Sequence, residues 1–123
     1  MNNSLELSDA VTLVVIVPET HADQVREAMG RAGAGKIGNY SSCSFSVKGW
    51  GRFMPEKEAQ PFIGRKGILE TVAEERIETR CNRECIGDVM EAIRRVHPYE
   101  EPLIDLYPIY QFHQEITRVK QEK

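Results

Sequence analysis

The sequence predicts one α+β domain in which strands and helices follow the order βαββαβ. Four short apolar or alternating segments are typical of strands, and two segments with helical spacing lie between them. A length of 123 residues suits a single hydrophobic core, and 41% apolar with 28% charged residues is the composition of an ordinary globular chain. We therefore expect a folded domain with one core.

The first half of the chain predicts a strand, a helix and a second strand. Residues 11–18 form a β-branched apolar run that ends at a proline, as a buried strand does. Thr20 is placed to cap a helix, which Gly33 and Gly35 end. The helix carries one apolar stripe at positions i, i+3, i+4 and i+7, made of Val25, Ala28, Met29 and Ala32. Alternation over residues 40–47 predicts the second strand.

A long connection follows over residues 48–66. It contains several glycines and prolines, but its aromatic residues Trp50, Phe53 and Phe62 predict an ordered arm.

The second half of the chain repeats the strand, helix, strand pattern. Residues 68–81 contain the third strand, and Asn82 is placed to cap the second helix. That helix has the apolar stripe Ile86, Val89, Met90 and Ile93. Residues 103–109 predict the fourth strand, and Pro108 favours an edge position because proline donates no ladder hydrogen bond.

Two such halves with both helices on one face of an antiparallel sheet make the ferredoxin-like arrangement. We expect this domain over residues 11–110, a frayed or disordered N-terminus over residues 1–10 and a C-terminal tail over residues 111–123. The other sheet face would be uncovered in a monomer, which predicts a homo-oligomer.

Composition excludes several classes of partner. The net charge of −3 disfavours nucleic-acid binding, which needs a basic face. No apolar run has the length of a membrane span, so we expect no membrane partner. The three cysteines, at irregular spacing, predict a cytoplasmic protein with free, packed thiols rather than a Cys43–Cys81 disulfide or metal site.

The predicted topology gathers candidate site residues at one end of the sheet, below the long connection. The candidate ligand-binding residues are Glu19, His21, His97, Tyr99, Glu100 and Glu101. His21 and His97 are the candidate metal ligands, and a divalent transition metal is the candidate cofactor, since imidazole and carboxylate suit such ions. The structural alternative is that His97 complements a helix dipole, Tyr99 packs and the glutamates are solvated.

No catalytic residues are predicted. Residues 33–38 match G-x-G-x-x-G, but they follow a helix and precede a strand, the reverse of a dinucleotide-binding loop. Glu70, Glu74, Glu75 and Glu78 are interpreted as an exposed charged face. No nucleophile with a supporting base is visible, so we expect binding rather than catalysis.

Four segments resemble a known family. They are V-P-E-T-H-A at 17–22, A-G-A-G-K-I-G-N-Y-S-S-C-S-F at 32–45, P-F-I-G at 61–64 and H-P-Y-E-E-P at 97–102. Together they resemble the small insert domain of the YqfO, or Nif-three-like, family over residues 13–109, and the last segment also resembles CutA proteins. The resemblance implies a CutA/PII-like domain, often a trimer, here as a stand-alone version without the metal chemistry of the flanking domain.

Three functions remain open. The first is an oligomeric binding or regulatory module with a metal or small-ligand site at the loop end. The second is a protein-interaction domain without a small ligand that docks through the aromatic arm of residues 50–62. The third is a hydrolase with a site between subunits.

Overall fold

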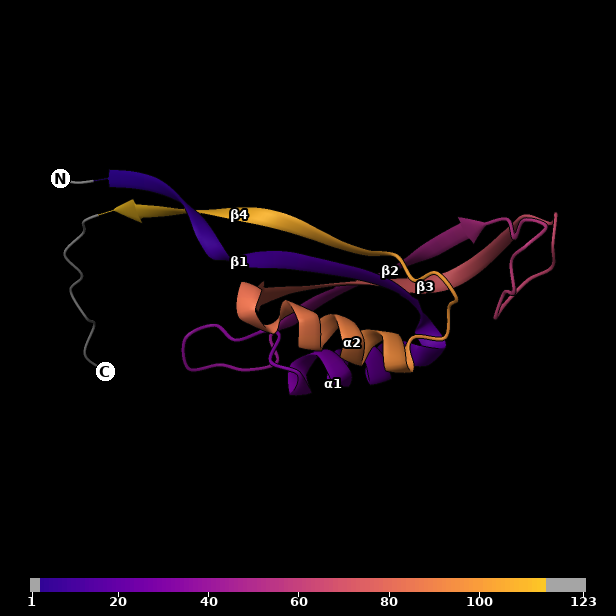
Figure 1. The fold of residues 1–123 in the computed structure, drawn as a ribbon, viewed down its shortest axis with the longest axis horizontal. Helices are drawn as coiled ribbons and strands as arrows, with labels where there is room; N and C mark the ends of the chain where they lie inside the picture. Colours follow the sequence, from indigo (N-terminus) through magenta and orange to yellow (C-terminus); the bar gives the residue numbers. More distant parts are fainter. Residues whose placement is uncertain (1–2, 115–123) are drawn as a thin grey trace.

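The computed structural model describes residues 3–114 and confirms the ferredoxin-like α+β fold. One antiparallel sheet has the strand order β2-β3-β1-β4, and both α-helices lie on the same side of it (Figure 1). The elements are β1 Asn3–Pro18, η1 Glu19–His21, α1 Ala22–Arg31, β2 Ser44–Phe53, β3 Glu70–Asn82, η2 Arg83–Cys85, α2 Ile86–Val96 and β4 Ile104–Gln114. No helix in this described part is long and apolar enough to cross a membrane.

The core lies between the sheet and the two helices. Alternate residues of β1, an inner strand of the sheet, are fully buried against the helices. They include Leu13, Val15 and Val17. The predicted helical stripes supply the opposite side through Val25, Met29, Val89 and Ile93. Burial of each such aliphatic side chain contributes roughly 1.5–3 kcal/mol, so this layer fixes both helices on one face.

Both helices begin differently from the prediction. Each is entered through a 3-10 turn, and neither starts with a side-chain cap hydrogen bond. Thr20 lies inside η1, and its hydroxyl contacts Nδ1 of His21 at 2.8 Å instead of capping α1. Asn82 precedes η2 rather than α2. The 3-10 turns η1 and η2 directly precede α1 and α2, in the positions where a capping residue would lie.

The N-terminal strand is longer than predicted. β1 begins at Asn3, within the segment of residues 1–10 that was expected to be frayed. Its early part pairs with the end of β4, from Asn3 opposite Gln114 to Leu7 opposite Tyr110, before an irregularity between Leu7 and Val11. Residues 115–123 of the predicted tail lie outside the described part of the chain.

The second strand is shifted toward the C-terminus. β2 spans Ser44–Phe53, so the first residues of the predicted connection belong to the sheet, and the loop to β3 covers residues 54–69. Before β2, Ser42 has a positive φ of 56°, which turns the chain instead of extending it.

Further sequence predictions for the fold are confirmed, although β4 spans Ile104–Gln114 and so extends beyond the predicted residues 103–109. β4 is an edge strand, as Pro108 indicated. Gly33, Gly35 and Gly38 have φ angles of 109°, 84° and 56°, as a helix-ending turn requires. All three cysteines are free.

Candidate functional site

The candidate site lies at the sheet end where β1 finishes and α2 leads into β4. The segment 97–103 crosses this end, and its attachment to β1 includes a hydrogen bond from the Ile16 amide to the Leu103 carbonyl, 3.1 Å. The loop of residues 54–69 folds onto the same segment. The Gln60 amide donates to Oε1 of Glu100 at 3.0 Å, and the loop is closed by a 2.7 Å bond from the Gly67 amide to the Pro55 carbonyl.

His97 fastens this segment. Its Nε2 lies 2.7 Å from the Ile16 carbonyl, and its Nδ1 lies 3.2 Å from the amide of Tyr99. Because a carbonyl only accepts and an amide only donates, this pattern assigns a neutral imidazole with the proton on Nε2. Burial lowers the pKa of His97, although the bond to Ile16 and the charge of Glu74 oppose that effect. Both ring nitrogens therefore have backbone partners.

Tyr99 extends from this segment to a carboxylate on β3. Its hydroxyl donates to Oε2 of Glu74 at 2.6 Å, and only 7% of Glu74 is exposed. Burial and then the bond to Glu74 raise the pKa of Tyr99, so its hydroxyl stays protonated as a donor. The carboxylate lies against Gly51 of β2, where any Cβ would overlap it. A glycine on the neighbouring strand therefore makes room for the buried charge.

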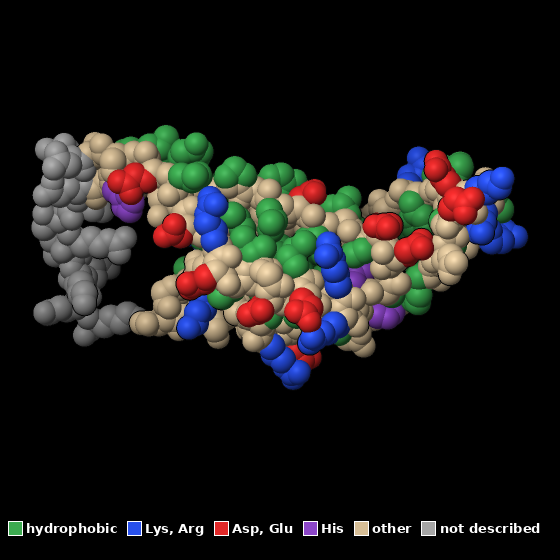
Figure 2. All heavy atoms as spheres, viewed as in Figure 1, with side chains coloured by type: hydrophobic (Ala, Val, Ile, Leu, Met, Phe, Trp, Pro, Cys, Tyr) green, Lys and Arg blue, Asp and Glu red, His purple; other side chains and the backbone are tan. Residues whose placement is uncertain are grey.

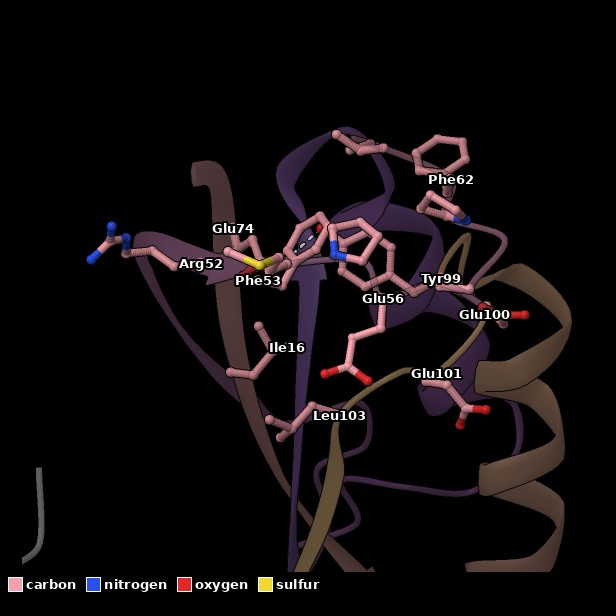
Figure 3. A pocket seen from close by; sticks show the side chains of 15 residues that line it. Ile16, Arg52, Phe53, Glu56, Phe62, Glu74, Tyr99, Glu100, Glu101 and Leu103 are labelled. Carbon is pink, nitrogen blue, oxygen red and sulfur yellow. Dashed lines mark hydrogen bonds between the residues drawn. The ribbon is translucent and has the colours of Figure 1, made fainter. Parts of the chain in front are cut away.

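A cavity of about 440 Å³ opens beside this pair, between the loop and the sheet. We call it the loop-end cavity. Its lining comprises Ile16, Arg52, Phe53, Met54, Pro55, Glu56, Ala59, Pro61, Phe62, Ile63, Glu74, Tyr99, Glu100, Glu101 and Leu103. Figure 3 shows the Glu56 side chain extending toward the region of Ile16 and Leu103, whereas the Arg52 side chain points away from the other labelled residues.

Aromatic rings connect the cavity to the two histidines. The Tyr99 ring lies 5.8 Å from Phe53, 6.4 Å from Phe62 and 5.1 Å from His97 between centroids. His21 meets Phe62 edge to face at 5.5 Å. These contacts hold the loop over the sheet end through apolar packing rather than through backbone pairing alone.

The predicted site residues are distributed over this end. Tyr99, Glu100 and Glu101 line the loop-end cavity, while His21 and His97 reach it only through ring contacts. Glu19 lies instead on a separate shallow hollow, beside Arg26 and Glu75.

The metal site expected at His21 and His97 stays a prediction. Among residues 3–114, no three His, Cys, Asp or Glu side chains are grouped to hold one ion.

The interpretation of the β3 glutamates was wrong for two of them. Glu74 and Glu75 are each 7% exposed and point to opposite faces of the sheet. Glu75 faces the helices and accepts from Nη1 of Arg26 at 2.6 Å, which pins α1 to β3. The bonds to Asp23 and Glu75 raise the pKa of Arg26. Glu75 is therefore structurally paired with a cation, whereas the hydrogen bond found for Glu74 among residues 3–114 comes from a neutral phenol.

Sequence reasoning did not identify Glu74, Glu56 or the aromatic walls as site residues. The available signal was the aromatic content of the predicted arm, which contributes Phe53 and Phe62 to the cavity. Nothing in the local sequence distinguishes Glu74 from its neighbours, since its burial comes from Gly51 and Tyr99 on other segments.

Comparisons with known proteins add relatives and fold neighbours. No family model matches the chain. A protein of Halalkalibacterium halodurans described as GTP cyclohydrolase 1 type 2 homolog is 58% identical over 97 residues, which are 79% of this chain and 26% of that protein. The Bacillus cereus protein related to NIF3 has a similar structure, with a TM-score of 0.72 and 42% identity over 89% of this chain and 29% of that one. CutA from Synechococcus elongatus shares the fold at a TM-score of 0.60 and 17% identity, over 88% of this chain and 85% of that one.

The chain thus spans about a quarter of the length of the curated relatives it matches.

Proposed function

Because the chain belongs to the YqfO, or Nif-three-like, family and has the CutA/PII-like fold, we propose that it is an oligomeric module that binds a small organic ligand in the loop-end cavity. The observation that carries this proposal is the buried Glu74–Tyr99 pair in the cavity wall. The cyclohydrolase named in the relatives' description stays outside the proposal, because the chain spans only a quarter of those proteins.

The Glu74–Tyr99 pair supports a binding role because burial of the Glu74 carboxylate lowers the stability of the fold, and a role in folding alone would not explain it. A buried carboxylate is normally compensated by a cation or by several donors, as Glu75 is by Arg26. Glu74 has one phenol hydroxyl, and its surroundings are mainly apolar. Polar groups placed singly in an apolar cavity are typical of ligand sites, where they fix the orientation of the ligand.

Assembly is the second part of the proposal, and a trimer is the state that the family resemblance implies. The start of β1, residues 3–7, pairs with the end of β4, residues 110–114. They form a two-stranded ribbon that continues past the helices (Figure 1). On one face of it, Leu5 lies opposite Phe112 and Leu7 lies opposite Tyr110.

These four side chains are 53–65% exposed. A contiguous exposed apolar surface of this kind is unusual in a monomeric protein. Figure 2 shows hydrophobic side chains along this rim of the molecule, on the side away from the helices. We propose that further copies of the chain cover the apolar ribbon face.

A second candidate function is docking of a protein partner on the β2 side. Trp50 is 75% exposed on β2, which favours a contact surface there as well. Trp50 does not line the loop-end cavity, so its replacement separates the two functions. Loss of partner binding in Trp50→Ala with an intact cavity would support the docking role.

The binding proposal is tested by filling the cavity. Ala59 lines it, so Ala59→Phe should abolish shifts that small aromatic probes cause in the amide resonances of Phe53, Phe62 and Tyr99. Lys57→Phe is the matched control, because Lys57 is exposed on the same loop and does not line the cavity. Probes that bind equally well to Ala59→Phe, or that shift none of these resonances in the wild type, would refute the proposed site.

A further inference from the structure

The charged residues that line the loop-end cavity are mostly acidic. Glu56, Glu74, Glu100 and Glu101 line it, and the one cation among its lining residues is Arg52. The Arg52 side chain points away from the other labelled residues (Figure 3), so it does not neutralise them. One oxygen of Glu100 already accepts from the Gln60 amide. Such a lining disfavours phosphate and carboxylate ligands and favours a positively charged group.

The walls of the cavity suit a flat ligand. The rings of Phe53 and Phe62 both contact Tyr99, with centroids 5.8 and 6.4 Å from the Tyr99 ring. Proline and aliphatic side chains complete the lining, Pro55, Pro61 and Ile63 among them. Aromatic faces attract both planar rings and organic cations, and the attraction to cations is stronger where water is excluded. A volume of about 440 Å³ accommodates a small ring system.

The Glu74 carboxylate determines which donor groups of a cationic ligand the cavity can bind. An ionised carboxylate offers about four acceptor sites, and the hydrogen bond found for Glu74 within the described residues uses Oε2 alone. Tyr99 holds the carboxylate from one side, and Gly51 lets it sit close to β2. The remaining acceptor sites suit a planar group with two N–H donors, such as an amidinium, because such forks match a carboxylate in geometry as well as in charge.

We propose that the loop-end cavity is selective for flat organic cations that carry paired N–H donors, with Glu74 as the residue that recognises the donors. This inference rests on the proposed ligand-binding function and adds the chemical class of the ligand. The cavity and the buried Glu74 carboxylate in its wall together support this ligand class. The exposed glutamates of the lining add only long-range attraction to a cation.

Three probes of one shape but different charge test the class. Benzamidinium is cationic, benzamide is neutral and benzoate is anionic, and each is titrated into the full chain while amide resonances are followed by NMR. We expect benzamidinium to bind about tenfold or more tightly than benzamide, as a charge-assisted hydrogen bond implies, and benzoate to bind most weakly. In Glu74→Gln the preference for benzamidinium over benzamide should shrink to about twofold or less.

Two variants control this experiment. Glu78→Gln removes a partly exposed carboxylate from the same strand, which pairs with Arg76, and should keep the full preference. Glu74→Asp keeps the charge but draws the carboxylate back from the cavity, so the preference for benzamidinium should fall in it too, and it provides a second reading if Glu74→Gln does not fold.

The outcomes separate the two proposals. If benzamide or benzoate binds at the cavity as tightly as benzamidinium, or if Glu74→Gln keeps the preference, the ligand class is wrong and the cavity remains a binding site. If none of the three probes shifts the resonances of the cavity residues, both the class and the binding function are refuted.

Discussion

The hydroxyl of Tyr99 donates a 2.6 Å hydrogen bond to Glu74, although the two residues are 25 positions apart, with Glu74 in β3 before α2 and Tyr99 after it. The bond joins the segment that follows α2 to the third strand. It also holds a carboxylate in the wall of the loop-end cavity. The structural and the proposed functional properties of this end of the molecule therefore depend on the same pair.

Removal of the Tyr99 hydroxyl should destabilise the fold. In Tyr99→Phe the buried carboxylate of Glu74 loses its donor, which is expected to lower the free energy of unfolding by about 1–3 kcal/mol. Urea denaturation measures the change, and Tyr40→Phe serves as the control because Tyr40 is 74% exposed. Equal stability of the two variants would mean that the Glu74–Tyr99 bond contributes nothing to folding.

A methyl group at residue 51 should disturb the same carboxylate from the other side. Gly51→Ala places a Cβ where the Glu74 carboxylate lies, so Glu74 must leave its position or the strands must separate. We expect a lower melting temperature and altered amide resonances for Tyr99.

Gly49→Ala is the matched control for this substitution. Gly49 lies in the same strand directly opposite Glu74, and a Cβ there meets nothing within 4 Å. Because glycine costs a strand about 0.5–1 kcal/mol relative to alanine, this variant should be as stable as the wild type or more stable. A similar loss of stability in both variants would contradict the role assigned to Gly51.

His97 should make the fold sensitive to mild acid. Burial lowers its pKa below the ordinary value of 6.5, so the unfolded chain binds the proton more readily than the folded chain. The contribution of neutral His97 is complete above pH 6.5 and is lost as the pH falls through the folded pKa. The charges near His97 are Glu74, which raises its pKa, and His21, which lowers it.

The measurement is the free energy of unfolding between about pH 7.5 and pH 5, around the unperturbed histidine pKa. The wild type should lose stability over this interval, and His97→Gln should lose less of it. His113→Gln is the control, since His113 is exposed at the ribbon. A slope unchanged in His97→Gln would show that another group is responsible.

The apolar ribbon face should control assembly. Leu7→Glu places a charge beside Tyr110, and we expect it to reduce the oligomer to smaller species in analytical ultracentrifugation. Gln111→Glu adds the same charge to the polar face of the ribbon, where Gln111 lies opposite Glu6, and should leave assembly unchanged. A wild-type chain that is monomeric at micromolar concentration would refute the proposed assembly itself.

The fold was predictable because its signals are local. The β-branched run of residues 11–18 and the stripes through Val25, Met29, Val89 and Ile93 identify the core elements by their periodicity alone. The early part of β1 was missed because its polar residues gain their partners only from the far end of the chain, in β4. The extent of β2 was missed because Gly49 and Gly51 indicate a loop unless the neighbouring carboxylate is known.

The site was only partly predictable for a similar reason. The clustering of Tyr99, Glu100 and Glu101 follows from the topology, which places the segment after α2 at the loop end. Glu74 could not be distinguished from the other glutamates of its strand, because its burial depends on strand register and on residue 99. The role of His97 also depends on a tertiary contact, its bond to the Ile16 carbonyl.

A crystal structure of the chain with benzamidinium tests the central claim most directly. The account predicts the probe in the loop-end cavity, its ring against Phe53 or Tyr99 and its nitrogens within hydrogen-bonding distance of the Glu74 carboxylate. An empty cavity at a saturating concentration of the probe, or a probe bound there with its nitrogens turned away from Glu74, would contradict it.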